Sequence, residues 1–115
     1  MNYKFDEIIS APCRLGILAA LVPGAAVSFT AMKAATSLSD GNLHVQTRKL
    51  ADVNYIEIQK TMKGRRTVTE FRITELGRER LRHHVMKLQK ILDAETDPPA
   101  RTPRSGRPDD SAVWA

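Results

Sequence analysis

The stretch that decides the fold runs from Ser37 to Arg72 and reads SLSDGNLHVQTRKLADVNYIEIQKTMKGRRTVTEFR. Its first part, about residues 40–53, has the apolar spacing of an amphipathic helix that begins after a Ser or Asp cap. Two runs of strand-forming residues follow, 55–62 and 67–73, and the short basic turn Lys63–Arg66 separates them. A helix narrow enough for the DNA major groove, followed by a hairpin with a cationic tip, is typical of a nucleic-acid-binding surface.

The segments on either side of this stretch complete a small α+β fold that is mainly helical. Residues 12–22 are broadly apolar, and Pro12 suits the first turn of a helix. Ser28 is a suitable cap for a second helix that carries Phe29 to Leu38. Thr74 is placed to cap a last helix after the second strand. The order predicts a winged helix-turn-helix with a three-helix core, a β-hairpin wing and a C-terminal dimerisation helix.

The positive charge is concentrated in the middle of the chain. The net charge of the 115 residues is +5. Residues 41–90 hold twelve basic and five acidic side chains, whereas residues 1–40 are balanced and residues 91–115 carry an acidic excess. Such a concentration over the helix, the hairpin and the C-terminal helix predicts a surface for a polyanion. The alternative is a well-solvated surface with surplus lysine and arginine.

The helix over residues 40–53 has two chemically different sides. The inward side is expected to carry Leu43, Thr47, Leu50 and Val53. The opposite side, with its flanks and its cap, gives the candidate DNA-binding residues Ser39, Gly41, Asn42, His44, Val45, Arg48 and Lys49. Arg48 can chelate a guanine edge or a phosphate, and the amides of Asn42 and Gln46 can pair with adenine. An ordinary solvated helix face is the alternative interpretation.

The turn between the two strands forms a second candidate contact with DNA. Lys63, Arg65 and Arg66 stand within four residues of each other, so they repel one another unless they face solvent or a polyanion. In a winged helix this cluster would contact phosphates beside the major groove or enter the minor groove. Lys60 and Arg72 on the stem are able to extend the patch. A solubilising turn is the alternative.

The last helix carries a narrow apolar seam. Its members follow a 4-3-4 spacing and are Leu81, Val85, Leu88 and Leu92. A seam of this kind predicts a two-fold interface with a second copy of the chain. A dimer would place two recognition helices about 34 Å apart on an inverted-repeat site. A monomer whose last helix packs back onto its own domain is the alternative.

Several other classes of protein are not supported by the sequence. Cys13 is the single cysteine, which excludes an intrachain disulfide and fits a reducing cytoplasm. His83 and His84 are adjacent, so they point about 100° apart on a helix, and no metal site is expected. His84 is read as a packed or solvated histidine, with a pH-sensitive dimer contact as the alternative. We expect no enzyme activity, no cofactor and no membrane span.

The composition changes near the end of the chain. Four of the six prolines follow Asp93, among Arg, Ser, Asp and Gly. We therefore expect residues 1–94 to form one DNA-binding domain with its C-terminal helix, and residues 95–115 to be a disordered tail.

Three segments resemble the small winged-helix transcriptional regulators of the ArsR/MarR-like group, found in bacteria and archaea. They are APCRLGILAAL (11–21), LSDGNLHVQTRKLADVNYIEIQK (38–60) and KGRRTVTEFRITELGRERL (63–81). The resemblance covers about residues 5–93, and TELGRERL directly after the second strand is especially typical of the group.

The resemblance implies a cytoplasmic homodimer that binds double-stranded DNA sequence-specifically as a repressor or activator. The matching contact positions are Asn42, His44, Val45 and Arg48 in the helix, with Arg65 and Arg66 in the wing. Thr47 departs from the leucine that relatives often carry on the buried side, where its hydroxyl can bond back to the helix backbone. A protein–protein interaction module and a nonspecific architectural DNA binder are the alternatives. The operator and any small-molecule effector are left open.

Overall fold

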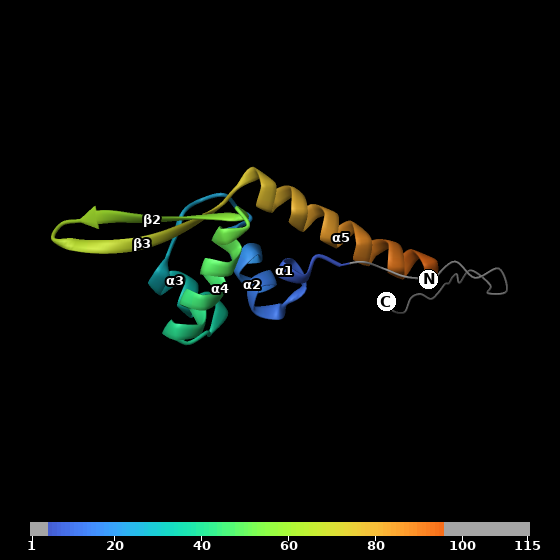
Figure 1. Cartoon of the computed structure of the whole chain (residues 1–115), viewed down its shortest axis with the longest axis horizontal. Helices are drawn as coiled ribbons and strands as arrows, with labels where there is room; N and C mark the ends of the chain where they lie inside the picture. Colours follow the sequence, from blue (N-terminus) through green and yellow to red (C-terminus); the bar gives the residue numbers. More distant parts are fainter. Residues whose placement is uncertain (1–4, 96–115) are drawn as a thin grey trace, which may run out of the picture.

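The computed structural model describes residues 5–95 of the chain. The order of elements is α1 (Glu7–Ser10), α2 (Pro12–Leu21), β1 (Val27–Ser28), α3 (Phe29–Thr36), α4 (Asp40–Asp52), β2 (Ile56–Lys63), β3 (Arg66–Ile73) and α5 (Glu75–Glu95). The helices α1 to α4 gather at the centre, while the β2–β3 hairpin projects to one side and α5 to the other (Figure 1). The predicted winged helix-turn-helix is confirmed. Within the described residues, no helix has the length and apolar character that crossing a membrane requires.

The last helix, α5, continues through Glu95, one residue past the expected end of the domain. The remainder of the expected disordered tail, residues 96–115, lies outside the described residues, as do residues 1–4 of the expected domain.

The sheet has three antiparallel strands in the order β1-β3-β2. Strands β2 and β3 pair along their whole length, from Ile56 opposite Ile73 to Lys63 opposite Arg66. Gly64 and Arg65 form the two-residue turn, and Gly64 has a φ of 66°, which glycine adopts without strain. The pairing therefore fixes which side chains of the hairpin face the helices.

One core joins all the elements of the domain. It consists of Ile9, Ile17, Leu18, Leu21, Met32, Leu43, Leu50, Tyr55, Ile56, Phe71 and Ile73. As expected, α4 buries Leu43, Thr47 and Leu50, and the Thr47 hydroxyl donates to the carbonyl oxygen of Leu43 at 2.7 Å. Burial of these aliphatic side chains is the main favourable term in folding such a domain.

Three apolar residues at the margins of the core lie differently from what the apolar spacing of the sequence predicts. Leu38 was expected in the second helix of the core, but α3 ends at Thr36, where Ser37 takes up a left-handed conformation with φ 61°. Val53 was expected to pack inward and is 36% exposed, because α4 ends one residue before it. Ile58 alternates with the polar residues Glu57 and Gln59 along the strand, yet it is 37% exposed.

Tyr55 connects the end of α4 to three other parts of the fold. Asn54 has a φ of 68° and reverses the chain, after which the Tyr55 amide donates to Leu50 in α4 at 2.9 Å. The Tyr55 carbonyl oxygen accepts from the amide of Thr74, just before α5, at 3.0 Å. Its hydroxyl donates to Asp6 Oδ2, just before α1, at 2.6 Å. The start of the wing is thereby tied to both terminal helices.

The first turn of α5 lies directly against the backbone of Tyr55. As expected, Thr74 caps the helix, since its Oγ1 accepts from the amide of Gly77 at 2.9 Å. The same hydroxyl donates to the carbonyl oxygen of Asn54 at 2.7 Å. A Cβ atom on Gly77 would stand 2.1 Å from the Tyr55 carbonyl oxygen, so this contact requires glycine.

We expect Gly77→Ala to lower the free energy of unfolding by about 1–3 kcal/mol, because α5 must shift away from Tyr55 to admit the methyl group. Gly16→Ala is the matched control, since Gly16 also lies in a helix and has no atom within 4 Å of the added Cβ. That change should leave stability equal or raise it by about 0.5–1 kcal/mol. Urea denaturation of the two variants measures the difference, and equal effects would contradict the close contact.

The Asp6–Tyr55 hydrogen bond makes stability depend on pH at both extremes. Partial burial alone would raise the pKa of the Asp6 carboxyl, but hydrogen bonds from Tyr55, Ile8 and Ile9 outweigh it and lower the pKa. Burial and the hydrogen bond to Asp6 raise the pKa of the Tyr55 hydroxyl to about 12. The contribution of Asp6 to the free energy of unfolding is therefore lost as the pH falls below about 4. The contribution of the Tyr55 hydroxyl is lost as the pH rises from about 10 toward 12.

Tyr55→Phe should lower the free energy of unfolding by about 1.5–3 kcal/mol at neutral pH, because it removes a hydrogen bond to a charged group. The gap between wild type and variant should narrow on acidification below about pH 4, where Asp6 takes up its proton. Urea denaturation between neutral pH and pH 3 measures both effects. A gap that stays constant over this range would show that the hydrogen bond to Asp6 is not the cause.

Candidate nucleic-acid interface

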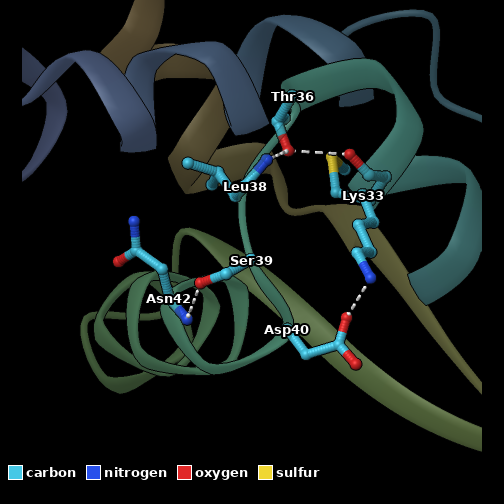
Figure 2. A network of polar contacts seen from close by, with 7 residues as sticks. Lys33, Thr36, Leu38, Ser39, Asp40 and Asn42 are labelled. Atoms are coloured by element: carbon cyan, nitrogen blue, oxygen red, sulfur yellow. Dashed lines mark hydrogen bonds and ion pairs between the residues drawn. The ribbon is translucent and has the colours of Figure 1, made fainter.

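The turn between α3 and α4 is held by side chains at both of its ends (Figure 2). Ser39 caps α4, because its Oγ accepts from the amide of Asn42 at 3.1 Å. Lys33 of α3 forms an ion pair with Asp40 at 2.7 Å, which compensates the acidic residue at the start of α4. The Thr36 hydroxyl donates to Met32 and accepts weakly from the amide of Leu38. These contacts set the angle at which α4 leaves the turn.

The outer side of α4 has the composition that the sequence predicted. Gly41, His44, Val45, Arg48 and Lys49 are exposed. No acidic residue occurs between Gly41 and Ala51. The exposure of these side chains is thus as expected, while their contact with DNA stays a prediction.

Asn42 and Gln46 lie at the edge of α4 that faces α2. Arg14 of α2 donates from Nη1 to Gln46 Oε1 at 2.6 Å, and Gln46 Nε2 donates to Asn42 Oδ1 at 2.9 Å. Arg14 also donates to the carbonyl oxygens of Ile8 and Glu7, at 2.6 and 3.1 Å. Both amides were expected to be available for adenine, and both are instead engaged within the protein. Sequence reasoning missed Arg14, which lies 32 positions before its partner in the chain.

His44 packs on its protein side against the aromatic side chain of Phe29. Its ring lies 4.7 Å from that of Phe29, centroid to centroid, with 35° between the planes. Phe29 in turn lies 6.2 Å from the buried Phe71. The imidazole is therefore positioned by a stack that reaches the core, while its edge remains exposed.

A groove of about 560 Å³ lies between α4 and the hairpin, lined by His44, Thr47, Arg48, Ile58, Lys60, Thr69 and Phe71. No carboxylate lines it. The pairing register explains why, because Glu57 and Glu70 alternate with the groove-facing residues and so lie on the other face of the hairpin. Lys60 faces the groove, whereas Arg72 lies on the opposite face and donates to the carbonyl oxygen of Gly24 at 2.8 Å. Of the two stem cations, therefore, only Lys60 extends the candidate surface.

The tip of the hairpin exposes Lys63, Arg65 and Arg66. Lys63 lies 3.7 Å from Glu70, a long contact between a largely exposed lysine and a glutamate on the outer face. Within residues 5–95, neither Arg65 nor Arg66 forms a salt bridge. The two arginines are thus available to a polyanion.

The seam on α5 divides into two parts. Leu81 is half-buried and packs against the core of its own chain. Val85, Leu88 and Leu92 are 54%, 42% and 54% exposed in the C-terminal half of α5. His84 is buried and meets Phe5 edge-on at 6.0 Å, so it is a packed histidine within its own chain. Among the described residues, no three His, Cys, Asp or Glu side chains are grouped to hold a metal ion.

Most of the chain matches one known protein family. The family described as "Winged helix DNA-binding domain" matches residues 13–92. The chain belongs to this family. The predicted winged-helix DNA-binding family is thereby confirmed, and the described function of the domain is DNA binding. Among curated proteins, no match to this sequence was found.

Several solved structures share the fold. The transcriptional regulator homologue from Pyrococcus horikoshii OT3 is 27% identical, with a TM-score of 0.73 over 78% of this chain and 89% of that one. The YusO protein from Bacillus subtilis is 16% identical, with a TM-score of 0.68 over 77% of this chain and 62% of that one. A cysteine-to-serine mutant of MarR from E. coli is 17% identical, with a TM-score of 0.63 over 77% and 68%. This winged helix therefore has the architecture of DNA-binding transcription regulators.

Proposed function

We propose that the protein is a cytoplasmic, homodimeric transcription regulator that binds double-stranded DNA sequence-specifically. In this proposal α4 enters the major groove, and the hairpin tip contacts the backbone or the minor groove. The observation that carries it is the carboxylate-free groove between α4 and the hairpin, which brings Arg48 and Lys60 onto one concave surface. A duplex is the polyanion whose grooves fit a helix and a neighbouring loop together.

In this proposal α4 supplies side chains that can contact the edges of bases in the major groove. Arg48 is exposed near the middle of α4, where a guanidinium can donate two hydrogen bonds to guanine O6 and N7. Val45, 51% exposed, offers methyl groups to a thymine methyl. Gly41 has no atom within 4 Å of its missing Cβ and lies beside the N-terminus of α4, which favours approach of a phosphate there. Ser39, His44 and Lys49 flank these groups on the same surface.

The wing supplies contacts that do not depend on sequence. Lys63, Arg65 and Arg66 are exposed at the end of a hairpin that projects from the helices. Cations in such a position neutralise phosphates, and each phosphate neutralised adds about 0.9 to the negative slope of log K against log salt. Affinity from the wing and specificity from α4 are thus separable.

The projecting part of α5 supports the dimer. Val85, Leu88 and Leu92 follow one another along the helix and remain exposed beyond the core, where a second copy related by a two-fold axis would cover them. Leu81, packed against its own core, forms the inner end of this proposed interface. Such a dimer would recognise an inverted repeat with half-sites about one helical turn apart.

The roles of α4 and the wing predict two different binding phenotypes. Arg48→Ala should cost about 1–3 kcal/mol on a selected operator and relax preference at one base position. Replacing Arg65 and Arg66 by Ala should weaken all sequences alike and flatten the salt slope by about 1.8 per protomer, or about 3.6 for the proposed dimer. Selection from random duplexes followed by fluorescence anisotropy at several salt concentrations measures both effects.

Arg82→Ala is the matched control, because it removes the same charge from an exposed position on α5. It should change neither preference nor salt slope. Binding that is unaffected by both Arg48→Ala and the wing variant would refute the assigned surface. A salt-dependent affinity without any preferred sequence would indicate an architectural binder, and no affinity for duplex at low salt would indicate a protein–protein module.

The proposed dimer predicts that Leu88→Asp yields a monomer, since the change buries a charge in the interface. Met86→Asp is the control, because Met86 is also exposed but lies about 160° around α5 from Leu88. It should leave the dimer intact. Sedimentation equilibrium of the two variants and the wild type measures the oligomeric state, and a monomeric wild type would contradict the proposal.

A further inference from the structure

We propose that Asn42 is a specificity-determining residue that presents N–H donors alone to DNA, and that Arg14 and Gln46 are the positioning residues that impose this. The consequence is recognition of a hydrogen-bond acceptor, either on a base edge such as that of guanine or on a phosphate. The inference rests on the proposed function, because it assumes that α4 faces a duplex.

The three side chains form a directed chain of hydrogen bonds from α2 to the edge of α4. Arg14 Nη1 donates to Gln46 Oε1 at 2.6 Å, and Gln46 Nε2 donates to Asn42 Oδ1 at 2.9 Å. Asn42 and Gln46 are one helical turn apart, so their side chains meet along the same edge of α4. Asn42 is only partly covered, and its end of the chain reaches the surface.

The direction of this chain is set by chemistry. A guanidinium carries donors and no acceptor, so the Gln46 amide must turn its oxygen toward Arg14. Its nitrogen then faces Asn42, which must in turn present its oxygen to Gln46. The group of Asn42 that is left for a ligand is the amide NH2 at Nδ2, which carries two N–H donors.

Arg14 is held in place by other contacts, so it is a fixed starting point for the chain. Its Nε donates to the Ile8 carbonyl oxygen at 2.6 Å, and its Nη2 donates to that of Glu7 at 3.1 Å. These are carbonyls of α1, which the guanidinium ties to α2. Because each of its three nitrogens donates once within the protein, Arg14 orients the amides from a fixed position.

This arrangement changes which base Asn42 can recognise. Paired recognition of adenine requires an amide that accepts from N6 through its oxygen and donates to N7 through its nitrogen. Asn42 Oδ1 is turned along the helix toward Gln46 and keeps only its second lone pair, so the paired geometry that adenine requires is disfavoured while the bond to Gln46 holds. Guanine N7 and O6, thymine O4 and phosphate oxygens require donors alone. The structure therefore disfavours the adenine pairing that the sequence suggested.

The variant Gln46→Glu tests the inference, because it reverses the chain. The carboxylate still accepts from Arg14, but it has no donor for Asn42, and it attracts the Asn42 amine instead. Asn42 would then turn its oxygen outward and favour bases that donate, cytosine or adenine. The shape of the side chain is kept, and thermal unfolding checks that the fold is retained.

The readout is sequence preference, which a merely structural role would not move. Binding sites are selected from random duplexes with the wild type, Asn42→Ala and Gln46→Glu. If a base is the acceptor, Asn42→Ala should lower affinity about threefold to tenfold at one position, and Gln46→Glu should shift that position toward cytosine or adenine. Replacing guanine there by 7-deazaguanine should reproduce the loss of affinity where N7 is the acceptor.

If a phosphate is the acceptor, Asn42→Ala should weaken binding to all sequences alike. A methylphosphonate at one site should then remove the difference in affinity between wild type and Asn42→Ala.

Two results would overturn the inference while leaving the proposed function intact. One is a wild-type preference for adenine that Asn42→Ala abolishes. The other is binding unchanged in both affinity and preference by Asn42→Ala and Gln46→Glu, while Arg48→Ala still lowers it. If Arg48→Ala and the wing variant also leave binding unchanged, the proposed function fails and this inference fails with it.

Discussion

Tyr55 is the residue on which the arrangement of this winged helix depends. Its amide closes the end of α4, its carbonyl oxygen receives the turn before α5, and its hydroxyl reaches Asp6 at the start of α1. Gly77 approaches the same carbonyl so closely that no side chain fits between them. The helices α4 and α5 and the wing thus diverge from one small junction, and their relative orientation depends on main-chain contacts.

The interface is built by removing competing charge as much as by adding cations. Lys33 offsets Asp40 at the start of α4, and the strand register keeps Glu57 and Glu70 away from Arg48 and the groove. The positive potential that remains is directed to one concave side, where a polyanion gains most from it. Hydrogen bonds also orient polar side chains at this surface, since Arg14 fixes the orientation of the Gln46 and Asn42 amides at the edge of α4.

Short-range patterns in the sequence predict most of the fold and part of the candidate site. Periodicity and capping residues predicted the helices and strands, because Ser28, Ser39 and Thr74 act on backbone groups within three positions of themselves. Long-range geometry was beyond such signals. Gly77 needs glycine because of Tyr55, which lies far back in the chain, and Arg14 reaches Gln46 across 32 positions. Likewise, Lys60 and Arg72 look equivalent in sequence, and only the register separates them.

The two-residue turn at the tip of the hairpin has an electrostatic consequence. It sets Lys63 opposite Arg66 and so fixes the pairing of every residue down to Ile56 and Ile73. Side chains alternate between the faces of a strand, so a slip by one residue would bring the outer-face glutamate of that strand, Glu57 or Glu70, beside α4. A slip of β2 would replace Lys60 on the groove side by Glu57 and Lys63, and a slip of β3 would bring Arg66 and Arg72 there together with Glu70. In this protein, turn length therefore controls which charges line the groove as well as the shape of the strand pair.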